Sequence, residues 1–122
     1  MGEIMKELIN SFKYAFNGIF IFIKNERNLK IHLFMMILVI IFGVLLDINK
    51  YEWYICIILF IVVISSEVFN TAIELTMDFI STEENKKIKH IKDLSAGAVL
   101  ITAIGSAIIG LFIFIPKILL II

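Results

Sequence analysis

The chain has 122 residues, of which 61% are hydrophobic, and its mean hydropathy is +1.02. A soluble domain of this length could not bury so much apolar surface, so these values indicate an integral membrane protein. The formal net charge is zero, which provides no basic surface for nucleic acid. The single cysteine, Cys56, lies in an apolar run without metal-ligand spacing, which excludes an internal disulfide and a cysteine-type zinc site.

The first two predicted elements are a surface helix and a membrane span. Residues 4–24 have apolar side chains at steps of three and four, with lysine and asparagine opposite, which predicts an amphipathic helix at the bilayer surface. Residues 31–46 are almost continuously apolar and predict the first transmembrane helix. His32, at the start of this span, is expected to bind a nearby backbone group or a lipid headgroup rather than to act in catalysis.

Two further spans are predicted. Tyr51, Trp53 and Tyr54 mark a membrane interface, and residues 53–80 then predict a second span with a cytoplasmic extension. The polar, lysine-rich segment 81–93 is followed by a third span over 94–115, which ends before Pro116. Small residues on this third span favour close helix contact and a homo-oligomer. The predicted fold is therefore an all-α, multi-pass membrane domain that covers residues 1–122, with lysine and arginine placing the N-terminus in the cytoplasm.

A row of polar side chains continues out of the apolar part of the second span: Glu67, Asn70, Glu74 and Asp78. Steps of three and four place them on one helical face. At 1.5 Å per residue from Glu52, Glu67 lies about 22 Å and Glu74 about 33 Å along the helix, near the cytoplasmic interface. Ionisable groups are costly at membrane depth and persist there mostly where they bind, pair or react. A solvated helix end is a reasonable alternative for Asp78 but not for Glu67.

These residue types fit phosphoryl transfer. Carboxylates on one face repel one another unless a cation neutralises them, and an oxygen ligand such as Glu74 suits Mg²⁺, which commonly shares its coordination shell with nucleotide phosphates. Lys92 enters from the same interface and can hold a phosphate, with Asp93 beside it to orient the lysine or a ligand hydroxyl. The sequence contains neither a phosphate-binding loop nor a kinase glycine-rich loop, which excludes those soluble nucleotide-binding folds.

Four separated segments resemble one known family. Residues 67–78 (EVFNTAIELTMD), residues 92–99 (KDLSAGAV) and the upstream segments 11–15 and 26–32 are similar to the signature of the prokaryotic diacylglycerol kinase family. The resemblance covers nearly the whole chain. It implies a homotrimer of three-span protomers in the bacterial cell membrane, which uses MgATP to phosphorylate a lipid alcohol in active sites shared between protomers.

The resemblance also implies roles for individual residues. Glu67 resembles the general base that takes the proton from the lipid hydroxyl, with Asn70 beside it, and Lys92 resembles the residue that contacts the terminal phosphate. Glu26 and Glu74 resemble the metal-binding pair; without the resemblance, Glu26 would simply end the surface helix. The residues that match the family's nucleotide site are Ser11, Lys13, Glu26, Glu74, Asp78, Lys92 and Asp93.

The acceptor predicted from the resemblance is undecaprenol. Residues 26–28 (ERN), 70–72 (NTA) and 95–99 (SAGAV) are more similar to the undecaprenol kinases of Gram-positive bacteria than to the Gram-negative type, for which diacylglycerol is the alternative acceptor. A different class of function is a small oligomeric channel or proton relay lined by the same carboxylates. Such a channel predicts acidic groups spread through the membrane depth, whereas here they cluster at one interface. A non-catalytic membrane scaffold is the third hypothesis.

Overall fold

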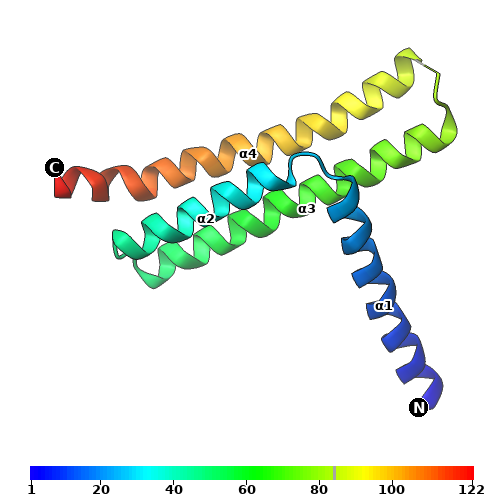
Figure 1. Ribbon diagram of the computed structural model, residues 1–122, viewed down its shortest axis with the longest axis horizontal. Coiled ribbons are helices and arrows are strands. Elements are labelled where there is room, and N and C mark those ends of the chain that lie inside the picture. Colours follow the sequence, from blue (N-terminus) through cyan, green and yellow to red (C-terminus); the bar gives the residue numbers. More distant parts are fainter. Residues whose placement is uncertain (84) are drawn as a thin grey trace.

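Four α-helices make up the part of the chain that the computed structural model describes, residues 1–83 and 85–122. They are α1 (Gly2–Asn25), α2 (Leu29–Leu45), α3 (Lys50–Ile80) and α4 (Lys86–Ile121). Figure 1 shows α2 and α3 as an antiparallel hairpin, with α4 beside α3 and running back along it. The expected all-helical architecture is confirmed, and α3 is the central helix that contacts each of the other three.

The helix α1 is set apart from the other three. A sharp bend of 101° separates it from α2, and it projects away from the α2–α4 layer (Figure 1). Phe22, near its C-terminal end, is its buried residue. The helices α3 and α4 are each long and apolar enough to cross a membrane, and the bent α1–α2 pair provides up to a third span. By length and composition, the described residues thus provide two candidate spans, or three if α1 and α2 cross the membrane as one bent pair.

The turn between α2 and α3 is closed by tight packing and by a helix cap. A Cβ added at Gly43 would lie 2.6 Å from a ring carbon of Trp53, so the indole requires glycine on the facing helix. The Asn49 side chain accepts a hydrogen bond from the Glu52 amide, and the Glu52 carboxylate accepts one from the Asn49 amide, which caps α3. Glu52 also forms an ion pair with Lys117 of α4 at 3.0 Å, which joins α3 to α4 at this end.

The pairing of α3 and α4 extends beyond the predicted spans. The helix α4 begins at Lys86, within the segment predicted to be a polar loop, because lysine favours helix and the Asn85 side chain accepts from the Lys87 amide. It also continues through Pro116, which transmembrane helices tolerate. Ser66 and Thr102 share a hydrogen bond at 3.0 Å between the two helices. The long α3–α4 pair therefore carries polar residues from the membrane interior to the helix ends.

Candidate active site

Three polar side chains are buried in the described part of the protein, and all three lie on α3 and α4. They are Glu67, with 3% of its surface exposed, Thr71, with 6%, and Ser95, with 7%. Each has a polar partner from another helix or from the α1–α2 turn. Since a buried polar group is costly without a hydrogen bond, these partners explain how the three side chains are accommodated. They define the inner part of the candidate site.

Glu67 is bound from α2 by a histidine. The distance between His32 Nε2 and Glu67 Oε1 is 2.6 Å, and only 18% of the His32 side chain is exposed. With Glu67 ionised, the Nε2–H group donates to the carboxylate, and the short distance is typical of a charge-assisted hydrogen bond. The expectation that His32 binds a backbone group or a headgroup was wrong. The reason is the hairpin, which brings the first turn of α2 against the middle of α3.

Glu26 lies in the break between α1 and α2, where its side chain turns toward α3. Its Oε1 atom accepts a hydrogen bond from the Asn28 amide at 2.8 Å, and its Oε2 atom accepts one from the Thr71 hydroxyl at 3.0 Å. The carboxylate thus joins the turn to the central helix. Because Thr71 follows Glu67 by one helical turn, Glu26 and His32 bind the same stretch of α3 from the same side.

A second chain of hydrogen bonds crosses from α4 to α3. The Ser95 hydroxyl donates to Asn70 Oδ1 at 2.7 Å, and Asn70 Nδ2 donates to Glu74 Oε1 at 3.1 Å. These two contacts fix the orientation of the Asn70 amide. Glu74 itself is exposed. The arrangement therefore presents a carboxylate that is held in position and is accessible to a ligand.

The pair Glu26 and Glu74 fits one kind of metal ion. Thr71, which binds Glu26, lies three residues before Glu74, a rise of about 4.5 Å along the same face of α3. Within residues 1–83 and 85–122, no three His, Cys, Asp or Glu side chains converge as a metal cage. Mg²⁺ does not need one, since it is usually held by one or two carboxylates together with phosphates and water. Two carboxylate side chains on this part of α3 and the adjoining turn are donors of the type that this ion uses.

Basic and acidic side chains line a cavity of about 520 Å³ between the end of α3 and the start of α4. Lys92 Nζ donates to Asp78 Oδ1 at 2.6 Å, and Lys89 Nζ donates to Asp93 Oδ2 at 2.8 Å. The expectation that Asp93 orients Lys92 was wrong, because adjacent residues on a helix do not face each other, whereas residues four apart do. Lysine ammonium groups around a cavity of this size suit a phosphate-bearing ligand.

Ser11 and Lys13 are not brought to the rest of the site within this chain. Both are exposed, and the Ser11 hydroxyl donates to the carbonyl of Glu7 on its own helix at 2.9 Å. They lie in the N-terminal half of α1, which projects away from the other helices (Figure 1).

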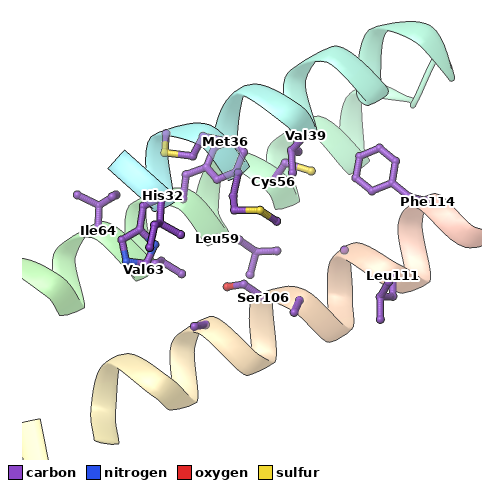
Figure 2. Close-up of a pocket in the computed structure, with 16 residues that line it drawn as sticks. His32, Met36, Val39, Cys56, Leu59, Val63, Ile64, Ser106, Leu111 and Phe114 are labelled. Carbon is purple, nitrogen blue, oxygen red and sulfur yellow. The ribbon is translucent and has the colours of Figure 1, made fainter. Parts of the chain in front are cut away.

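An apolar groove runs alongside the buried carboxylate. It has a volume of about 530 Å³ and is lined by α2, α3 and α4. Figure 2 shows His32 near Val63 and Ile64 at one end of this groove and Phe114 toward the other. The His32 side chain therefore lines the apolar groove and also binds the Glu67 carboxylate through its Nε2 atom.

Sequence reasoning did not assign His32, Thr71 or Ser95 to the site. A signal existed for His32, since it is the one ionisable residue among residues 31–46, and such residues inside membranes are usually functional. Thr71 and Ser95 belong to the segments that carry the family resemblance, but hydroxyl groups are common in membrane helices. Only the three-dimensional arrangement shows that both hydroxyls hold carboxylate or amide groups of the site.

Fold and site together define a small helical membrane protein with carboxylates, an amide and lysines gathered along one end of its longest helix pair. The model of the prokaryotic diacylglycerol kinase family matches residues 13–114. The chain is 39% identical over 113 residues to the undecaprenol kinase of Bacillus subtilis (strain 168), which covers 93% of this chain and 92% of that relative. It is 30% identical over 118 residues to a diacylglycerol kinase of Synechocystis sp., which covers 96% of this chain and 67% of that relative. The chain belongs to the prokaryotic diacylglycerol kinase family, which confirms the expected class of enzyme.

Proposed function

We propose that this protein is a kinase that transfers the terminal phosphate of ATP to undecaprenol and forms undecaprenyl phosphate. The observation that carries the proposal is the buried carboxylate of Glu67, on the same helix as a cavity lined by lysines. The similarity to the Bacillus subtilis undecaprenol kinase supports undecaprenol as the acceptor. The family and the Synechocystis relative support diacylglycerol as the second candidate.

In the proposed reaction, the lipid hydroxyl oxygen attacks the terminal phosphorus of ATP. A new oxygen–phosphorus bond forms, the bond from that phosphorus to the bridging oxygen breaks, and ADP leaves. Glu67 accepts the hydroxyl proton, and Asn70 lies one turn away to orient the reacting groups. Mg²⁺, when bound to Glu26 and Glu74, would supply positive charge to the phosphates. Burial of Glu67 keeps water from competing with the lipid hydroxyl.

Lys92 would hold the terminal phosphate. In this structure its ammonium group binds Asp78, and the two side chains are 36% and 56% exposed. An exposed ion pair of this kind is worth only about 0–1 kcal/mol, so a phosphate can replace the aspartate at low cost. Asp78 would hold Lys92 until the phosphate takes its place, and Asp93 would position Lys89 beside the nucleotide.

The proposed assembly is a homotrimer with its N-terminus in the cytoplasm and with sites shared between protomers. Two observations support it. Ser11 and Lys13 lie on α1, which projects away from the other helices of its own chain (Figure 1). Gly97 and Gly105 of α4 have no neighbouring atom within 4 Å of an added Cβ, which leaves room for a helix of another protomer. Mixing Glu67→Gln and Lys13→Gln protomers tests sharing, since a site that takes Glu67 and Lys13 from different protomers gives more activity in the mixture than the two variants give separately, and a site within one protomer does not.

The function is tested with purified protein in detergent and lipid, by measuring ATP-dependent phosphorylation of undecaprenol and diacylglycerol side by side. We expect faster turnover of undecaprenol and loss of activity in Glu67→Gln. The matched control is Glu3→Gln, which removes an exposed carboxylate from α1. Phosphorylation of diacylglycerol alone would replace the proposed acceptor, and full activity of Glu67→Gln would overturn the mechanism. Ion flux through liposomes without ATP would instead support the channel hypothesis.

A further inference from the structure

The contact between His32 and Glu67 joins two helices at the most buried polar side chain among the described residues. The donor and acceptor atoms are 2.6 Å apart, Glu67 is 3% exposed and the His32 side chain is 18% exposed. The surrounding groove walls are apolar, so water offers little competition for this hydrogen bond. No other ionisable residue lies among residues 31–46, which form most of α2.

We infer that His32 is a positioning residue that fixes the Glu67 carboxylate for proton transfer. This inference rests on the proposed function, in which Glu67 is the general base. A carboxylate on a flexible glutamate side chain can rotate, whereas a general base must stay within hydrogen-bond reach of the proton that it accepts. By donating to Oε1, the His32 Nε2–H group fixes the plane of the carboxylate and presents Oε2 to the acceptor hydroxyl.

The proton and electron balance of the step is unchanged by this role. The lipid oxygen gains its bond to phosphorus, the hydroxyl proton moves to Glu67 Oε2, and ADP leaves with the electrons of the broken phosphorus–oxygen bond. The Nε2–H group of His32 remains a donor to Oε1 throughout. His32 thus contributes orientation, and it touches neither ATP nor the transferred phosphate.

Two substitutions separate this role from a purely structural one. His32→Phe keeps a ring against the groove but removes the donor, whereas His32→Gln retains an amide N–H group at about the position of Nε2. Because small displacements of a reacting group can reduce rates about 100-fold, we expect His32→Phe to lower kcat roughly 30- to 100-fold. We expect an unchanged KM for MgATP in this variant. His32→Gln should retain kcat within about threefold of the unmodified protein.

The outcomes distinguish this inference from the proposed function. Unchanged kcat in a folded His32→Phe protein overturns the positioning role, while loss of activity in Glu67→Gln still supports the proposed function. Equal losses in His32→Phe and His32→Gln also overturn the role, since they show that the donor group is not what matters. Full activity of Glu67→Gln instead refutes the general base itself.

A spectroscopic measurement keeps the test informative where His32→Phe does not fold. The chain has two histidines, so His90→Gln leaves a single ¹⁵N-labelled imidazole, that of His32, to observe by NMR. We expect the Nε2 resonance to shift when Glu67 is replaced by Gln and to stay unchanged in Glu3→Gln. An Nε2 resonance that does not respond to Glu67→Gln shows that the contact is absent in the membrane and overturns the inference.

Discussion

The hydrogen bond between Thr71 and Glu26 provides a sharp test of the proposed metal site. Thr71→Val replaces a hydroxyl by a methyl group at a position that is 6% exposed, and both residues are β-branched, so the helix backbone is little affected. The substitution removes the 3.0 Å contact to Glu26 Oε2 but leaves the Asn28 amide bound to Oε1. Glu26 then keeps its place in the turn and loses its hydrogen bond to Thr71.

The expected magnitude follows from the charge of the acceptor. A hydrogen bond to a charged group contributes about 1.5–3 kcal/mol, and 1.4 kcal/mol corresponds to a tenfold change in affinity. Glu26 is only half-buried, so water replaces part of the lost contact and the lower end of this range applies. We therefore expect the apparent affinity for Mg²⁺ to fall roughly tenfold in Thr71→Val.

The assay is the initial rate of lipid phosphorylation, measured against Mg²⁺ concentration at fixed ATP. Thr71→Ser is the matched control, because it retains the hydroxyl donor and loses only a methyl group. Its Mg²⁺ dependence should stay within about threefold of the unmodified protein. An unchanged Mg²⁺ midpoint in Thr71→Val refutes the role of Glu26 as a metal ligand held by α3. An equal shift in both variants shows that packing, and not the hydrogen bond, is responsible.

Three further predictions concern other parts of the structure. Lys92→Gln should raise the KM for ATP about tenfold through loss of a charge-assisted contact, while Lys87→Gln leaves it unchanged, as ATP titrations of the rate will show. Gly43→Ala should lower the thermal unfolding temperature in detergent, because the new Cβ meets a ring carbon at 2.6 Å and overpacking costs about 1–3 kcal/mol. Glu52→Lys should also lower that temperature, and adding Lys117→Glu should recover part of the loss by restoring the 3.0 Å ion pair in reverse, because the Glu52 cap of α3 stays absent. A double variant no more stable than Glu52→Lys contradicts that interpretation.

The membrane fold could be predicted from sequence because composition and periodicity determine it directly. Apolar runs of this length are accommodated in lipid, where a helix forms all its backbone hydrogen bonds internally. The start of α4 was harder to predict, because the lysines of residues 86–92 are equally typical of a solvated loop and of a helix. The cap by Asn85 decides between these alternatives, and it is a local contact that composition does not reveal.

The ion pairs and hydrogen bonds of the candidate site could not be derived from spacing alone. Adjacency in sequence suggested that Lys92 pairs with Asp93, but the lysine binds Asp78, fourteen positions earlier, because α3 and α4 meet side by side. His32 was assigned a local partner, yet it binds Glu67, which is 35 positions away. Periodicity places side chains on a helical face, whereas the identity of the facing helix depends on tertiary structure.

Solvent exposure increases along α3 from Glu67 to Asp78, and this increase separates a buried part of the site from an exposed part. Glu67 is 3% exposed and Thr71 is 6% exposed, whereas the side chain of Asp78 is 56% exposed about 16 Å further along the helix. A proton acceptor is most useful where water is excluded, since water would otherwise compete for the phosphate, and a highly charged nucleotide loses the least hydration at a site that stays open to solvent. The buried middle of α3 is therefore suited to the hydroxyl group of a membrane alcohol, and its exposed C-terminal part is suited to a nucleotide. In the proposed reaction, Glu26 and Glu74 would hold Mg²⁺ between these two regions.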